Sequence, residues 1–337
     1  MHYLQNLSNE VDKTHPHLGN LIAVSLLAVK AKKFLLIVSP RGCGKSRATT
    51  FVALQSPQCL MPDAISRAAM GALEEQLSHF QGALVVDDLS RAQTDYAMIA
   101  TVASLAELCH GHSLSVYMQG SECQIVDFNA GVLANIQPVL LRKLIQQDLW
   151  ESSMMDKSIR YYHLYRPQKP NPLPPEITVD WGREITEVET PKLKGKMAHR
   201  LANICETQWG LTRLTEHLLD LLKASAALDK RTVVTNLDYR YLLKALLPLS
   251  LEGLVCDKTE LEAKRYLNSN ALAVLTEFVT YGQFTLRQLS RDYKVSESRC
   301  YQILNKMQKD WVIVAKEPTV YAPSKELLAK LKEVGLK

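Results

Sequence analysis

The sequence predicts an α/β fold in which helices cover both faces of a parallel β-sheet. Short apolar runs at 34–38, 83–86, 130–136 and 161–165 alternate with stretches of helical periodicity. Strands that are buried on both faces read as such unbroken runs, because neither face of the strand meets water. The first run leads directly into a glycine-containing loop and then into helix-forming sequence, a strand–loop–helix unit.

The chain is long enough for several units, and its composition changes along it. We expect a leader and helix at 1–32, an α/β core at 33–167 and a helical region at 191–255. Five of the 14 prolines lie between 167 and 175, which indicates a linker at 168–190. A further unit is expected at 266–337.

The seven cysteines contain no CxxC pair, which argues against a disulfide framework and a zinc ribbon. The group Cys109–His112 is interpreted as a helix-ending loop rather than a zinc site. Neither a secretory signal nor an apolar stretch of membrane-spanning length is evident, so the sequence predicts a cytoplasmic protein.

The loop after the first strand has the composition of a phosphate-binding P-loop. Gly42 and Gly44 allow backbone amides to surround a phosphate, Lys45 reaches its oxygens, and the Ser46 hydroxyl is a magnesium ligand. Ser39 departs from the usual pattern, which has glycine there. The residues expected to bind the nucleotide are Pro40, Arg41, Gly42, Cys43, Gly44, Lys45, Ser46 and Arg47.

Two acidic residues follow the apolar run at 83–86. Asp87 is expected to hold magnesium through water, and Asp88 to orient the attacking water as general base. A strand-ending turn is the alternative interpretation of this pair. The sequence therefore predicts ATP and Mg²⁺ as cofactors.

At these motifs the sequence resembles the AAA+ ATPases, over roughly residues 15 to 250. The resemblance implies a P-loop ASCE core (33–167), a helical lid (191–255) and a homo-oligomer, either a hexameric ring or a filament. It implies a sensor-one residue at Asn135, with Gln137 as the weaker choice, and a sensor-two arginine at Arg213. It also implies an arginine finger acting on a neighbouring subunit, for which Arg160 is preferred over Lys157 and Arg142.

Two alternating runs within 113–128 flank a Gly-Ser turn and predict a β-hairpin. Its position resembles the pre-sensor insertion of Holliday-junction motors and minichromosome-maintenance helicases, where the hairpin touches DNA. The predicted tip carries no Lys or Arg, so a structural role is an equal alternative.

The C-terminal unit reads as three helices followed by a β-hairpin, which resembles a winged helix. The basic excess of the chain lies here, since residues 285–337 contain 11 basic and 6 acidic residues and the net charge of the whole chain is +5. Such a local excess favours a polyanionic partner. The third helix is expected to contact DNA through one face, with a wing lysine beside it: Ser298, Arg299, Gln302, Asn305, Lys306, Lys309 and Lys316.

Together these patterns predict an ATP-hydrolysing, DNA-binding AAA+ protein that acts as an oligomer in replication, recombination or mobile-element processes. The first alternative is a STAND-like switch, in which ATP controls assembly and the winged helix serves packing. The second is a protein-remodelling ATPase that uses the 113–128 hairpin on polypeptide.

Overall fold

The structure, a computed structural model, describes residues 2–62, 65–89, 94–118, 121–167, 177–258, 265–307, 312–315 and 319–336. Five parallel strands form the central sheet in the order β2-β3-β6-β1-β7. They are β1 (Phe34–Val38), β2 (Cys59–Leu60), β3 (Gln81–Val86), β6 (Asn129–Ile136) and β7 (Ser158–Tyr162). The predicted α/β class is therefore confirmed, and all five carboxyl ends lie at one edge of the sheet.

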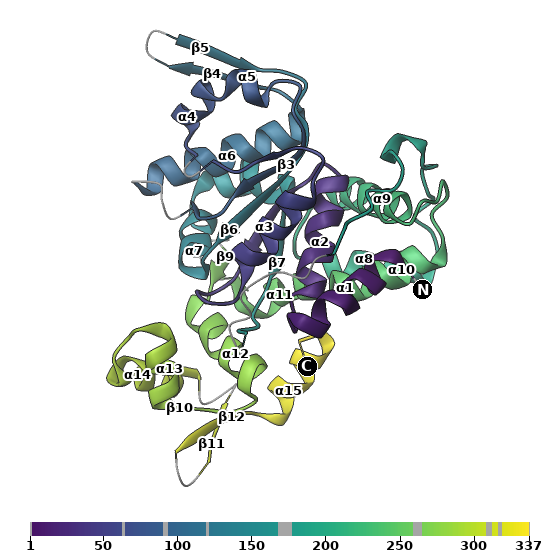
Figure 1. Cartoon of the computed structure of the whole chain (residues 1–337). Helices are drawn as coiled ribbons and strands as arrows, with labels where there is room; N and C mark the ends of the chain where they lie inside the picture. The colour runs from purple at the N-terminus through teal and green to yellow at the C-terminus, as the bar shows by residue number, and fades with distance from the viewer. Residues whose placement is uncertain are drawn as a thin grey trace.

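Helices cover both faces of this sheet (Figure 1). Leu35 and Ile37 of β1 belong to a core shared with α2 and α3, whereas Phe34, Leu36 and Val38 belong to a second core shared with α6 and α7. The alternation of strand side chains thus divides one apolar run between two cores. The helices are α1 (Tyr3–Thr14), α2 (Gly19–Lys30), α3 (Lys45–Gln55), α4 (Arg67–Ala72), α5 (Glu74–Leu77), α6 (Asp95–Gly111) and α7 (Pro138–Ile145).

Helix α2 lies very close to strand β6. A Cβ atom at Gly131 would lie 2.4 Å from the Cα atom of Val29, so only glycine permits this approach. Strand β7 begins earlier in the chain than the apolar run expected at 161–165, since its first residue, Ser158, pairs with Phe34 of β1. The polar residues Ser158 and Arg160 interrupt the apolar pattern of this buried strand. The apolar pattern alone therefore predicted a strand that starts too far along the chain.

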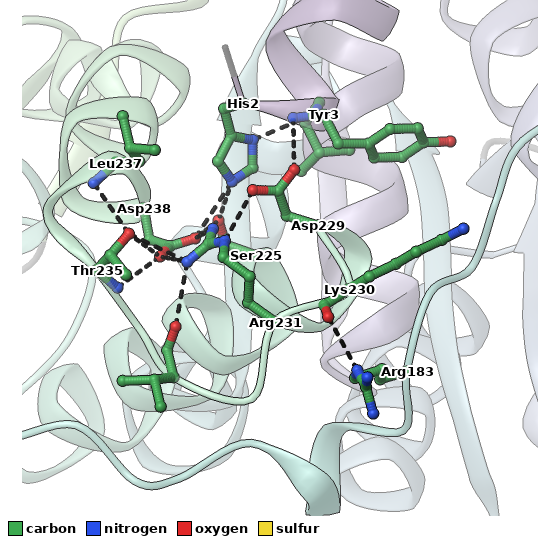
Figure 2. A network of polar contacts seen from close by, with 12 residues as sticks. His2, Tyr3, Arg183, Ser225, Asp229, Lys230, Arg231, Thr235, Leu237 and Asp238 are labelled. Carbon is green, nitrogen blue, oxygen red and sulfur yellow. Dashed lines mark hydrogen bonds and ion pairs between the residues drawn. The ribbon is translucent and has the colours of Figure 1, made fainter.

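The first residues of the chain form a helix rather than the expected polar leader. His2 caps α1, is buried, and contacts the Ser225 hydroxyl at 2.8 Å and the Asp238 carboxylate at 3.2 Å through Nε2 (Figure 2). Arg231 donates two hydrogen bonds of 2.7 Å to Asp238. A Ser-His-Asp triad would use one imidazole nitrogen for the serine and the other for the aspartate, but here His2 Nε2 contacts both. This network therefore anchors α1 and is not a catalytic triad.

The helical region consists of α8 (Lys196–Cys205), α9 (Leu211–Leu228), α10 (Asn236–Ala245) and α11 (Leu251–Val255), preceded by the 3₁₀ turn Ile185–Glu187. The first three of these helices share the core of α1, α2 and α3. Lys33, directly before β1, forms an ion pair with Asp220 of α9. This region therefore covers one face of the sheet and extends to its amino edge.

Residues 269–336, here called the C-terminal unit, contain the three predicted helices and a three-stranded antiparallel sheet of order β10-β12-β11. Thr285 accepts a hydrogen bond from the Gln288 amide, as expected for a helix cap. The elements are α12 (Ser269–Tyr281), β10 (Phe284–Thr285), α13 (Leu286–Tyr293), α14 (Glu297–Met307), β11 (Val312–Ala315), β12 (Val320–Pro323) and α15 (Lys325–Glu333).

The predicted hairpin consists of β4 (Leu114–Met118) and β5 (Ser121–Ile125), and its turn lies outside the described residues. It projects from the molecule at the end opposite the C-terminal unit (Figure 1). The remaining elements are the π turn Trp150–Met154, the 3₁₀ turns Met155–Lys157 and Leu247–Ser250, and the short pair β8 (Cys256–Lys258) and β9 (Arg265–Leu267). Within the described ranges, no helix combines the length and apolar character that crossing a membrane requires.

Candidate functional site

The loop between β1 and α3 has the backbone shape that a phosphate cradle needs. Gly42 and Gly44 adopt φ angles of +77° and +78°, which only glycine accepts readily, on either side of Cys43. Ser39 is not among the residues with positive φ, and its amide donates to the Ile136 carbonyl at 3.1 Å. A side chain is therefore tolerated at Ser39, which explains the departure from the usual pattern.

The Lys45 side chain folds back over this loop. Its ammonium donates to the carbonyls of Ser39 at 3.1 Å and Pro40 at 3.3 Å. Burial lowers the pKa of Lys45, while the negative forms of Cys43, Asp88 and Asp87 act in the opposite direction. The lysine and both predicted carboxylates thus share one electrostatic site at the carboxyl edge of the sheet.

Asn135 lies between the loop and the acidic pair, because β6 lies between β1 and β3. Its side-chain amide donates to Asp87 and to Thr49 of α3, both at 3.0 Å. Its carbonyl oxygen Oδ1 is buried and accepts no hydrogen bond from the described residues. An orphaned buried acceptor beside a carboxylate suits a polar ligand, such as a bound water.

Two residues that the sequence did not predict hold the loop from the far side. The imidazole Nε2 of His163 lies 2.9 Å from the Cys43 carbonyl, and Arg166 donates to the Arg41 carbonyl at 2.8 Å. Both follow β7. Because parallel strands end at the same edge of a sheet, residues that follow β7 lie near the β1–α3 loop. The polar side chains of His163 and Arg166, directly after this strand, were therefore the sequence signal that could have identified them.

Arg160 corrects a prediction. It is a fully buried residue of β7, and its guanidinium makes a two-pronged ion pair with Glu252 at 2.7 and 2.8 Å. It also donates to the Gln208 carbonyl and lies over the Trp150 ring. A guanidinium enclosed in this way cannot reach the nucleotide of a neighbouring subunit, so the assignment of Arg160 as arginine finger is wrong.

Arg213 is also placed away from the loop. It is ion-paired with Glu216, and it contributes, after burial, to lowering the pKa of His110 together with Lys157 and Lys33. Lys33 and Lys157 each directly precede a strand, so Arg213 lies at the amino edge of the sheet. The β1–α3 loop is at the carboxyl edge, and the expected contact of Arg213 with a γ-phosphate is therefore wrong in this structure.

The remaining candidates, Lys157 and Arg142 for the arginine finger and Gln137 for sensor one, lie at different edges of the sheet. Lys157 lies at the amino edge and forms an ion pair with Glu107 of α6. Arg142 is half-buried in α7, which begins at the carboxyl edge directly after β6. Gln137 accepts a hydrogen bond from Arg41 at 3.3 Å, so it belongs to the loop surroundings.

The Cys109–His112 segment ends α6, as the sequence interpretation expected. The Cys109 thiol is buried and donates to the Lys32 carbonyl at 3.2 Å, while His112 caps the helix with a positive φ. Across the described part of the chain, no group of three His, Cys, Asp or Glu side chains is arranged to hold a metal ion.

The predicted DNA-contacting face of α14 is on the surface. Ser298, Arg299, Gln302, Asn305 and Lys306 are all exposed, whereas Cys300 and Leu304 on the opposite face are fully buried. Lys309 and Lys316 lie outside the described residues. Tyr301, which the sequence interpretation omitted, is 53% exposed on the same helix and presents an aromatic ring to solvent.

A cavity of about 430 Å³ lies beside the β1–α3 loop. Its walls come from four parts of the chain that are distant in sequence. They are the end of α1 with the segment up to Leu18, Arg47 of α3, the residues 165–167 after β7, and Thr280 of α12.

No protein-family model matches the chain, and comparison with curated proteins finds no relative.

Proposed function

We propose that this protein is an ATP-hydrolysing AAA+ protein that binds DNA through the C-terminal unit, acting as a winged helix. The carrying observation is the convergence at one sheet edge of the two-glycine loop, Lys45, Asp87 and Asn135. A loop with two left-handed glycines at the start of a helix binds phosphate through its amides. Lysine and carboxylates beside it are the groups that phosphoryl transfer uses.

In this proposal the loop amides and Lys45 hold the β- and γ-phosphates. Asp88, half-buried in the segment directly after β3, accepts a proton from a water whose oxygen attacks the γ-phosphorus. The bond from the γ-phosphorus to the bridging oxygen breaks, and ADP and phosphate are released. Asn135 positions Asp87 through its 3.0 Å hydrogen bond and offers Oδ1 to a water.

The residues available for Mg²⁺ fit its chemistry. The Ser46 hydroxyl is exposed at the start of α3, and the Asp87 carboxylate faces the same site. Hydroxyl and carboxylate oxygens, completed by water, are the ligands that Mg²⁺ prefers. When bound, the ion would neutralise charge on the phosphates.

A STAND-like switch is the second candidate, and one observation favours it. The C-terminal unit shares a core with the ATPase sheet, and Arg166 beside the β1–α3 loop forms an ion pair with Glu277 of α12 at 3.2 Å. A unit packed in this way could report nucleotide state without contacting DNA. Assembly as a homo-oligomer stays a prediction, with Arg142 the remaining candidate for a residue acting between subunits.

ATP hydrolysis with and without DNA separates the two functions. If the protein is a DNA-dependent ATPase, we expect single-stranded or duplex DNA to change the steady-state rate several-fold. A phosphate-release assay on the full chain measures this. Slow hydrolysis that neither DNA form alters would support the STAND-like switch instead.

DNA binding should depend on salt, because phosphate contacts release counterions. With three or four phosphates neutralised, we expect a slope of about −3 on a plot of log affinity against log salt. Lys306→Ala should weaken binding to all sequences alike and flatten this slope by about one unit, whereas Gln302→Ala should matter only if bases are read. Fluorescence anisotropy on the full chain is the measurement, since the C-terminal unit shares its core with the sheet.

The matched control is Lys230→Ala, which removes an exposed lysine on the helical region. This variant should keep the affinity and slope of the wild type. If the wild type fails to bind either DNA form at low salt, the C-terminal unit is a packing module and the DNA-binding part of the proposal is wrong.

A further inference from the structure

The cavity beside the β1–α3 loop adjoins the proposed phosphate site. A Cβ atom at Gly44 would lie 3.2 Å from Leu18, and one at Gly42 would lie 3.6 Å from the Arg166 guanidinium. Both Leu18 and Arg166 also line the cavity, as does Arg47 in the first turn of α3. A nucleotide whose phosphates lie on the loop therefore has this cavity within reach of its sugar and base.

The walls offer the two kinds of contact that a nucleotide uses. The rings of His17 and Tyr165 stack with centroids 4.0 Å apart and planes 5° from parallel. The Tyr165 hydroxyl donates to the Leu336 carbonyl at 2.8 Å, which fixes the ring. Aromatic side chains of this kind are stacking platforms for nucleobases. Arg47 adds a cation suited to phosphate, whereas the other two cations of the wall are ion-paired, Lys13 with Glu10 and Arg166 with Glu277.

The C-terminal unit supplies part of this wall, and the helical region does not. Thr280 of α12 lines the cavity and accepts a hydrogen bond from the Arg166 amide at 3.1 Å. The Arg166 guanidinium pairs with buried Glu277 of α12 and lies over the Tyr293 ring of α13 at 5.3 Å. Among the described residues, none from 191–255 lines the cavity.

We propose that this cavity binds the base and sugar of the nucleotide, and that the C-terminal unit, rather than the region 191–255, forms part of the wall around them. The inference rests on the proposed ATP site at the β1–α3 loop, and it names the pocket for the rest of the ligand. Its consequence is that nucleotide binding contacts α12 directly. The unit that carries the candidate DNA face thereby forms part of the nucleotide site.

The test compares ATP with inorganic tripolyphosphate, which keeps the phosphates and lacks the nucleoside. Isothermal titration calorimetry on the full chain measures both affinities. In Tyr165→Ala, we expect the Kd for ATP to rise about 10-fold, in line with the loss of one stacking contact. The Kd for tripolyphosphate should stay at the wild-type value, which also shows that the loop is still folded.

A second variant probes the wall contributed by the C-terminal unit. Thr280→Phe places a large side chain in the cavity from α12, and we expect it to weaken ATP binding at least as strongly while leaving tripolyphosphate binding intact. Tyr165→Phe keeps the ring and loses only the hydroxyl, so it should retain most of the ATP affinity. Tyr96→Ala, at an exposed tyrosine on α6, is the matched control and should change neither affinity.

The outcomes separate the two proposals. If wild type binds both ligands and Tyr165→Ala and Thr280→Phe bind ATP as tightly as wild type, the nucleoside does not occupy the cavity and this inference is overturned. The phosphate site would then stand unchanged. If wild type binds neither ligand, the proposed ATPase function fails, and the cavity assignment fails with it.

Discussion

In the Lys45→Ala variant we expect the affinity for ATP to fall by at least about 100-fold, which removes hydrolysis at ordinary ATP concentrations. The physical reason is that Lys45 is the cation held against the β1–α3 loop, with Asp87 and Asp88 nearby. Without it, phosphate oxygens would face two carboxylates with no lysine to balance them. Fluorescent nucleotide titration and phosphate release measure the two effects.

The Asp88→Asn variant should behave differently. The amide keeps the shape of the side chain but cannot accept the proton of the attacking water, so binding should survive and hydrolysis should stop. Lys196→Ala removes an exposed lysine of α8 and serves as the control, with both properties unchanged. Equal loss of ATP binding in Lys45→Ala and Asp88→Asn would refute this division of roles.

The second large effect is on stability, at Glu252. In Glu252→Ala we expect the free energy of unfolding to fall by about 3–5 kcal/mol, because the guanidinium of Arg160 stays buried without its counter-charge. Glu252 also accepts hydrogen bonds from Tyr162 at 3.1 Å and from Gln208 at 3.1 Å. One substitution therefore removes a partner from three buried side chains, those of Arg160, Tyr162 and Gln208, and urea unfolding measures the result.

Two comparisons interpret that measurement. Glu216→Ala breaks the exposed Arg213–Glu216 pair and should cost only about 0.5 kcal/mol, since water screens it. The double variant Arg160→Met with Glu252→Leu should be less destabilised than Glu252→Ala, because no charge is left buried. A Glu252→Ala protein as stable as Glu216→Ala would show that the buried pair does not hold β7 to α11.

Local sequence patterns predicted much of the fold and the centre of the candidate site. The apolar run 34–38 matches β1, and the loop after it has its two positive φ angles at Gly42 and Gly44. Asp87 directly follows β3, and Asn135 lies near the end of the neighbouring strand β6. The Asn135 side-chain amide donates a hydrogen bond of 3.0 Å to the Asp87 carboxylate. Such features are predictable because a strand, a glycine loop and a strand end depend on residues adjacent in the chain, and parallel strands end at one edge.

The roles of the arginines depended on the tertiary structure. In sequence, Arg160 looks like a free cation near a strand, yet Glu252, distant in the chain, neutralises it inside the core. Arg213 begins a helix as expected, but that helix packs at the amino edge, away from the loop. Arg166, which no motif marked, lies beside Gly42.

The sequence by itself therefore determined the α/β class, the strand–loop–helix unit and the acidic strand end. Only the tertiary structure decided which cations approach the loop and which unit walls the cavity. The physical reason is that a long, charged side chain acts where its guanidinium lies, and that place depends on partners such as Glu252 and Glu277, which are remote in sequence. No local periodicity encodes those pairings.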